Sequence, residues 1–180
     1  MLLPPAVTAY HGCGQATYES VTLHHEPMKE SRNTYDWLGP GVYFWQDSEA
    51  RAWRWANECM ARGSIADAAV IKANIDLRNC LDLLQEQYRE ELKQAYQLME
   101  LEYQLVKKPL PLNISKLHCL DCAVISHLHQ FRDRTGDSPY DTVRAIFQEG
   151  NPIFPGSCIM EKDHIQIAVR NTACIKVLSP

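Results

Sequence analysis

Several features that define membrane proteins, secreted proteins or strongly basic nucleic-acid-binding proteins are missing from this chain. No apolar run approaches the roughly 18–20 residues of a membrane-spanning helix, so we expect no transmembrane segment. The start of the chain, residues 1–5, has neither a basic stretch nor a long apolar stretch, so we expect no secretory signal and a cytoplasmic location. The net charge of −4 gives no bulk attraction for nucleic acid, which would have to be held by local groups.

Cysteine is present, but not in a pattern that defines disulfides or a metal site. The seven cysteines are odd in number and scattered, and without an export signal we expect them to be reduced and mostly buried. Cys119 and Cys122 have ligand-like spacing, with His118, His127 and His129 nearby, but a second pair at zinc-finger spacing is missing. Because this segment also has helical periodicity, we expect a helix there and no metal.

The remaining composition is typical of one globular domain over residues 1–180. The apolar fraction is 46% and the charged fraction is 22%, with no internal repeat and no low-complexity segment. Strand-like segments lie at both ends of the chain, and the long helical segments are grouped between them. This order predicts the α+β class rather than a regular βαβ alternation.

Hydrophobic periodicity predicts the individual elements. The clearest strand is 69–77, where apolar and polar residues alternate strictly. Further strands are expected at 7–13, 42–45, 142–147, 157–160, 165–169 and 174–178.

Three helices are expected from apolar residues at helical spacing. Two cover about 82–106 and 120–131, and one runs from Asp47 or Ser48 to Arg62. The inner stripe of this last helix is predicted as Ala50, Trp53, Ala56 and Met60. Residues 15–36 are polar and long for a structureless loop, so they are either functional or contain a short helix.

Two short motifs carry most of the functional signal. The first is Ala9-Tyr10-His11-Gly12-Cys13, and the second, about thirty residues later, is Gly39-Pro40-Gly41-Val42-Tyr43-Phe44. The imidazole offers a polar contact to a ribose hydroxyl, and the glycine lets the backbone approach an amide. The tyrosine ring gives nicotinamide a face to stack on. Together they predict a nicotinamide-dinucleotide site built without a Rossmann loop.

These two motifs resemble the first two signature elements of the ADP-ribosyltransferase superfamily, in its His-Tyr-Glu branch. Over nearly the whole chain, runs at 37–45, 75–82, 141–144 with Glu149-Gly150, and 164–167 look like a group of small bacterial proteins. That group includes toxins of phage-defence toxin–antitoxin–chaperone systems that ADP-ribosylate messenger RNA. The resemblance implies a split β-sheet core with flanking helices, NAD as ADP-ribose donor, and an RNA acceptor. It also implies an antitoxin and a chaperone as partners.

The resemblance assigns roles to individual residues. His11 would contact ribose hydroxyls, Gly12 would hold the carboxamide through its backbone, and Tyr43, with Phe44 beside it, would stack on nicotinamide. The third signature element of the family is an acidic or polar residue that opens a late strand, here Gln166. If Ile165, Ile167 and Val169 face the core, then Gln166 shares the opposite face with His164 and Ala168.

Gln166 departs from the acidic residue of the family. A glutamine can bond a ribose hydroxyl, but it can neither supply negative charge nor take a proton from an acceptor. Either the acceptor is already a competent nucleophile, or a nearby carboxylate (Glu149 or Glu161) supplies the charge, or the protein only binds NAD. Arg144 could grip the NAD pyrophosphate or an acceptor phosphate. A protein acceptor stays open as an alternative to RNA.

Aromatic and basic residues add two further alternatives. Trp45, Trp53 and Trp55 could stack the bases of a single strand, or they could pack a helix on a sheet. A local phosphate-binding patch could come from Arg51, Arg54, Arg62 or Lys107-Lys108.

Overall fold

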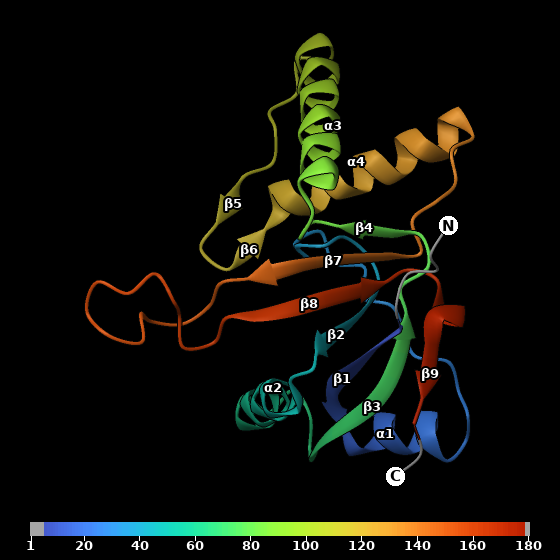
Figure 1. Ribbon diagram of the computed structural model, residues 1–180, viewed down its shortest axis with the longest axis vertical. Helices are drawn as coiled ribbons and strands as arrows, with labels where there is room; N and C mark the ends of the chain where they lie inside the picture. Colours follow the sequence, from blue (N-terminus) through green and yellow to red (C-terminus); the bar gives the residue numbers. More distant parts are fainter. Residues whose placement is uncertain (1–5, 179–180) are drawn as a thin grey trace.

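The computed structural model describes residues 6–178 and has a mixed seven-stranded sheet at its centre (Figure 1). Residues 1–5, on which the expectation about a secretory signal rests, lie outside the described part. The strand order is β4-β7-β8-β2-β1-β3-β9, and a separate pair, β5-β6, forms a small hairpin. All neighbours in the large sheet are antiparallel except β4 and β7. The fold is therefore α+β, as expected.

The expected strands are largely confirmed. The sheet consists of β1 (Ala6–Gly14), β2 (Val42–Gln46), β3 (Ala68–Asp76), β4 (Cys80–Asp82), β7 (Thr142–Phe147), β8 (His164–Val169) and β9 (Ile175–Val177). The hairpin consists of β5 (Asn113–Ile114) and β6 (Leu117–His118). The helices are α1 (Gln15–Thr22), α2 (Glu49–Ala61), α3 (Glu86–Leu105) and α4 (Cys119–Thr135), with a 3-10 turn, η1 (Thr172–Cys174).

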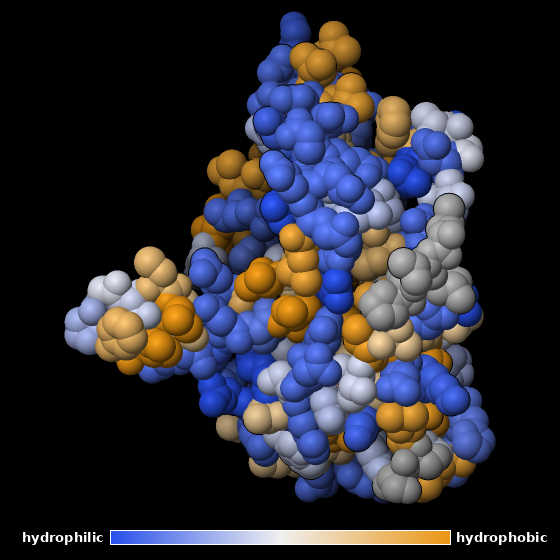
Figure 2. Space-filling model, in the orientation of Figure 1, coloured by the Kyte–Doolittle hydropathy of each residue, from blue (hydrophilic) through white to orange (hydrophobic). Residues whose placement is uncertain are grey.

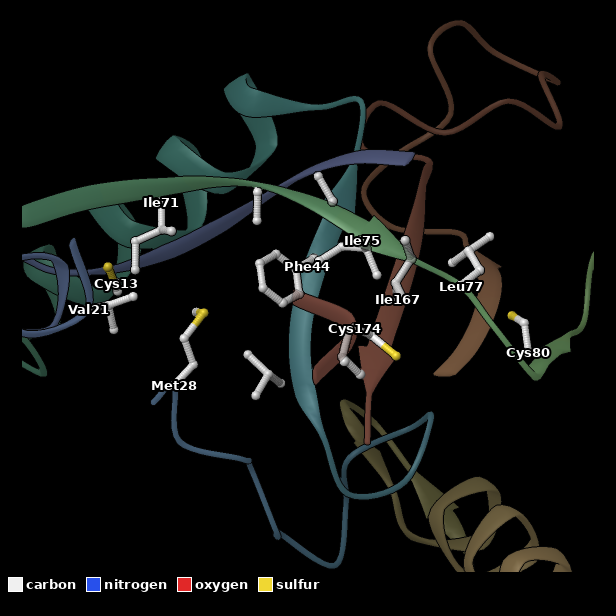
Figure 3. Packing of buried hydrophobic residues seen from close by; sticks show 14 of the residues in the cluster. Cys13, Val21, Met28, Phe44, Ile71, Ile75, Leu77, Cys80, Ile167 and Cys174 are labelled. Carbon is white, nitrogen blue, oxygen red and sulfur yellow. The ribbon is translucent and has the colours of Figure 1, made fainter. Parts of the chain in front are cut away.

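The two faces of the sheet bury different cores. Alternation in β3 sends Ile71, Ala73 and Ile75 to one face, where the Phe44 ring lies at the centre of a cluster that Figure 3 shows from close by. The other face is covered by α3 and α4, which pack over Val143 and Ala168. Both faces of the middle strands thus pack against other parts of the chain, and polar side chains on these strands lie between the sheet and those parts.

The sheet is divided between β1 and β2. Along β1, every residue from Ala6 to Gly14 has a partner in β3, whereas its described pairing with β2 is limited to Ala9 with Gln46 and Tyr10 with Trp45. Beyond Tyr10 the two strands separate. We call this two-pair junction the central seam, and the candidate site lies beside it.

Of the predicted inner stripe of α2, Ala56 is confirmed, whereas Trp53 and Met60 are wrong. The buried residues are Arg51, Ala52, Ala56 and Cys59, while Trp53 and Met60 are each 40% exposed. Small side chains face β1 because the helix approaches that strand closely, and the larger apolar residues are left on the outer side.

Two boundaries also differ from the predictions. The long helix begins at Glu86 rather than near Asp82, because residues 80–82 pair with β7 as strand β4. Residues 157–160 form no strand, and within the described chain this segment has a single bridge, from Met160 to Pro152. Two prolines and two glycines with positive φ, Gly150 and Gly156, keep residues 148–163 as an irregular loop.

This loop between β7 and β8, which we call the β7–β8 loop (148–163), projects from the body of the molecule at the left of Figures 1 and 2. Its tip has apolar surface, supplied by Ile153, Phe154 and Ile159, which are 49%, 59% and 59% exposed. Residues 15–36 contain the short helix α1, one of the two alternatives expected there. Among residues 6–178, no helix has the length and apolar character to cross a membrane.

Candidate active site

A cleft of about 860 Å³ lies beside the central seam, where β1 and β2 separate. Its walls come from β1, β2 and β8, the segment 29–37, α2, the β5–β6 turn and the start of the β7–β8 loop. Five predicted site residues, far apart in the sequence, line this cleft together: His11, Gly12, Tyr43, Glu149 and Gln166. Its volume is in the range of small-molecule and cofactor sites.

A second cavity, of about 670 Å³, lies between α3, α4 and β7. Apolar side chains such as Leu83, Leu92 and Leu120 make up most of its lining, and none of the predicted site residues reaches it. The chemistry-bearing residues therefore identify the cleft at the seam as the candidate site.

His11 is fixed by the second motif. Its Nδ1 lies 2.7 Å from the carbonyl oxygen of Tyr43, and because a carbonyl only accepts, Nδ1 is the protonated nitrogen. Burial, the largest influence, lowers the pKa of His11, although the bond to Tyr43 opposes it. The ring is therefore neutral at pH 7, and Nε2 is left as a hydrogen-bond acceptor at the cleft.

Gly12 of β1 lies directly against α2. A Cβ atom at this position would lie 2.5 Å from the carbonyl oxygen of Ala52 and 3.1 Å from Cε3 of Trp55. A methyl group cannot fit there unless the helix moves. The glycine thus sets the position of the α2 wall, a requirement additional to the backbone contact predicted for it.

Tyr43 presents its ring to the cleft, and its hydroxyl is used within the fold. The hydroxyl donates to the carbonyl of Gly39 (2.7 Å) and accepts from the amide of Leu38 (3.1 Å). Burial raises the pKa of Tyr43, so the phenol stays protonated. Phe44 points to the opposite face, is fully buried in the core, and has its ring centroid 5.6 Å from that of His11. It supports the site from behind and does not line the cleft, contrary to the expectation.

Gln166 is held in place by Trp37. The indole Nε1 donates to the amide oxygen of Gln166 over 2.5 Å, which leaves the amide nitrogen as a donor. Ala168 faces the α3–α4 core and His164 lines the cleft, so the expected sharing of one face by these residues is confirmed. This shared face is not a flat surface in bulk solvent: α3 and α4 pack over it at Ala168, and the cleft lies over it at His164 and Gln166.

Glu149 is the predicted carboxylate that reaches the cleft. Its Oε2 accepts from Nη2 of Arg51 over 2.5 Å, and its Oε1 lies 3.9 Å from Nζ of Lys162. Glu161 is exposed and turns back to Asn151 in the same loop, outside the cleft lining.

Arg144 does not reach the cleft, so the prediction that it grips a phosphate there is not supported by its position. It pairs across the sheet with Ile167, a core residue of the opposite face, whereas its neighbour Ala145 pairs with Gln166. Its Nε and Nη2 bond both carboxylate oxygens of Asp82 at 3.1 and 2.5 Å. Arg144 and Asp82 therefore form a structural ion pair.

Sequence reasoning missed the central place of Arg51, named only as one of several possible phosphate contacts. Of those, Arg51 and Arg62 line the cleft, whereas Arg54 and Lys107-Lys108 do not. The sequence does contain a signal for Arg51, because this charged residue lies beside the small residues of α2. Using that signal requires knowing which face of α2 is buried. Trp45 and Trp55 also line the cleft, while Trp53 lies outside it.

The cleft is locally basic in a chain of net charge −4. Lys29, Arg51, Arg62 and Lys116 lie on its walls against two acidic residues, Asp36 and Glu149. Asp36 is already occupied by Ser31 and Asn33, so the excess of positive charge favours an anionic ligand.

The cysteines and the histidines near Cys119 and Cys122 have other positions than a metal site would need. All seven cysteines lie in the described part of the chain and are unpaired. Within residues 6–178, no group of three His, Cys, Asp or Glu side chains is placed to hold a metal ion. Cys122 is buried in α4, and His118 instead lines the cleft, with Nδ1 3.3 Å from Asp121 Oδ2.

Comparisons with protein-family models, with curated proteins and with solved structures find no match for this chain. The functional assignment therefore depends on the geometry of the cleft and on the motif resemblance.

Proposed function

We propose that this chain is an NAD-dependent ADP-ribosyltransferase whose donor site is the cleft at the central seam. The observation that carries this proposal is the meeting of His11, Gly12, Tyr43 and Gln166 in one cleft, although up to 155 positions separate them. The division of the sheet between β1 and β2 is compatible with the split core that the resemblance implies.

The reaction would break the bond between nicotinamide and ribose C1′ through an oxocarbenium-like transition state, and pass ADP-ribose to an acceptor. The neutral His11 offers Nε2 to a ribose hydroxyl, and the Tyr43 ring offers its face to nicotinamide. The bond of His11 to the Tyr43 carbonyl and the bond of the Tyr43 hydroxyl to the Gly39 carbonyl hold both side chains in place before NAD binds. These side chains therefore need no reorganisation as charge develops in the transition state.

Glu149 would supply the negative charge that Gln166 lacks. Of the two carboxylates considered, it is the one on the cleft wall, where it pairs with Arg51 while the cleft is empty. Gln166 would then be left to bond the ribose 2′-hydroxyl through its free amide nitrogen.

RNA is the acceptor that we favour, specifically messenger RNA as in the toxins that the chain resembles. The basic walls suit a phosphate backbone, and Trp55 and Phe147 present aromatic side chains at the cleft. In this proposal the protein is a phage-defence toxin of the bacterial cytoplasm, neutralised by an antitoxin with a chaperone. A protein acceptor is the alternative.

Labelled NAD tests the reaction and the acceptor together. The purified chain is incubated with NAD labelled in the ADP-ribose part and, in parallel, with mixed RNA, single-stranded DNA or a protein extract. We expect label in RNA, lost in the His11→Ala and Glu149→Gln variants. Label in protein alone would replace RNA by a protein acceptor. No label in any arm would refute the transferase.

A non-catalytic NAD- or ADP-ribose-binding module is the second candidate. The observation that favours it is the neutral Gln166, whose oxygen is already taken by Trp37. Incubation with NAD alone separates the two functions. Release of nicotinamide that depends on His11 supports the enzyme, and saturable NAD binding without nicotinamide release supports the module.

A further inference from the structure

The Arg51 guanidinium has more donors than its surroundings use. Its side chain is 8% exposed, and Nη2 donates to Glu149. Nε and Nη1 are buried and have no acceptor among residues 6–178. Leaving the donors of a buried cation unused is costly, which indicates a ligand that supplies acceptors.

The groups around Arg51 favour an anion as that ligand. The guanidinium lies over the Trp45 ring, 5.4 Å from its centroid, and the indole Nε1 is another buried donor without an acceptor in the described chain. His164 donates through Nδ1 to the carbonyl of Lys162 (2.6 Å), so its buried Nε2 is an acceptor. Burial lowers the pKa of His164, and the nearby charge of Arg51 lowers it further, which keeps this ring neutral. Among the described residues around Arg51, three buried donors (Arg51 Nε and Nη1, and Trp45 Nε1) thus lack an acceptor, against one unused acceptor, His164 Nε2. This excess of donors favours an anion.

We propose that Arg51 is the centre of a phosphate subsite, and that Glu149 occupies its guanidinium until a nucleotide phosphate displaces it. A carboxylate and a phosphate present similar paired oxygens to arginine, so one can replace the other. The side chain of Glu149 is 32% exposed and already has Lys162 beside it as a second cation. Ligand binding thus releases Glu149 into the cleft as Arg51 is filled.

This subsite rests on the proposed function only for the source of the phosphate. That source is either the pyrophosphate of the NAD donor or the backbone of the RNA acceptor. Both present the same oxygen chemistry to Arg51.

The test uses three variants and a matched control. Arg51→Gln removes the charge, Arg51→Lys keeps it, and Glu149→Gln removes the competing carboxylate. Arg54→Gln is the control, because Arg54 is an exposed arginine of the same helix outside the cleft. Affinities for ADP, for adenosine and for a short single-stranded oligoribonucleotide are measured by calorimetry on the whole chain.

We expect opposite effects from the two partners of the pair. Arg51→Gln weakens ADP binding by about tenfold or more, the equivalent of losing one charge-assisted hydrogen bond, and leaves adenosine binding unchanged. Arg51→Lys weakens it less. Glu149→Gln tightens ADP binding, because the phosphate no longer competes with a carboxylate, and Arg54→Gln has no effect.

The same measurements identify the source and can overturn the subsite. An Arg51→Gln effect on ADP marks the donor pyrophosphate, and an effect on the oligoribonucleotide alone marks the acceptor backbone. If Glu149→Gln weakens both ligands, or a folded Arg51→Gln binds both as the parent does, the subsite is wrong. If Arg51→Gln does not fold, the direction in which Glu149→Gln changes the affinity for ADP and for the oligoribonucleotide decides whether the subsite is correct. Arg51-dependent ADP binding without any NAD turnover would keep the subsite and refute the transferase.

Discussion

Replacing Gly12 by alanine tests whether the glycine of the first motif is required by the packing of α2. The new Cβ atom would lie 2.5 Å from a backbone carbonyl oxygen, that of Ala52, which cannot rotate away as a side chain could. Overpacking of this kind costs about 3 kcal/mol, the upper part of its usual range. The loss of freedom in the unfolded chain returns roughly 0.5–1 kcal/mol. The net loss is therefore about 2 kcal/mol.

Gly14→Ala is the matched control, two residues along the same strand. Its Cβ would lie 3.4 Å from two carbon atoms of Ile65, an ordinary contact, and φ of −84° suits alanine. The small entropic gain is offset by a slightly poorer N-cap for α1, so we expect a change within about 0.5 kcal/mol.

Thermal unfolding of the two variants measures the difference. For a chain of this length, each kcal/mol shifts Tm by about 3 °C, so Gly12→Ala should melt about 6 °C below the parent while Gly14→Ala stays near it. NAD affinity should fall in Gly12→Ala as well, because α2 carries Arg51 and Trp55 on the cleft wall. Equal melting temperatures for the two variants would refute this account of Gly12.

Further predictions concern pH, an ion pair and a hydroxyl. Burial, followed by the charges of two arginines, lowers the pKa of His129 from 6.5 to about 3. Between these values the unfolded chain binds a proton that the folded chain does not, so stability falls with falling pH by up to about 1.4 kcal/mol per unit. Urea titrations at pH 7, 5 and 4 should show a smaller decline for His129→Leu, and an identical decline would contradict it. Arg144→Gln should cost about 3 kcal/mol by leaving Asp82 unpaired, with NAD affinity retained; loss of affinity in a variant with unchanged Tm would return Arg144 to the site. Tyr43→Phe should keep NAD binding and lose about 1 kcal/mol of stability, because its hydroxyl bonds only the 38–39 backbone among described residues. A large loss of affinity would place the hydroxyl on the ligand.

The strands could be predicted because their sequence signals are local. Alternation in β3 reports directly which side chains are buried, and both motifs lie on strands bounded by glycine. The phase of α2 could not be predicted in the same way. Trp53 and Met60 are apolar, yet the tight contact between α2 and β1 at Gly12 selects small residues. That error placed Arg51 on the wrong side of the helix.

The choice between Glu149 and Glu161 also needed the structure. Both lie beside turns in the same loop, and no periodicity distinguishes them in the sequence. Arg144 was misplaced for a related reason: its partner Asp82 was assigned to a helix, whereas residues 80–82 form a strand beside β7. Long-range pairings of this kind leave no local signal.

The central seam has a consequence for motion. In the described chain, two residue pairs join its backbone ladders, with one further backbone bond from Asp47 N to Thr8 O and the bond from His11 to the Tyr43 carbonyl. Side chains such as Phe44 pack the rest of the junction. The two parts of the sheet can therefore twist against each other without breaking a long ladder. Amide protons of Tyr10 and Trp45 should exchange with solvent faster than those of β3. A molecule that contacts both parts would clamp this twist, so occupancy of the cleft should be readable as slowed exchange at these two residues.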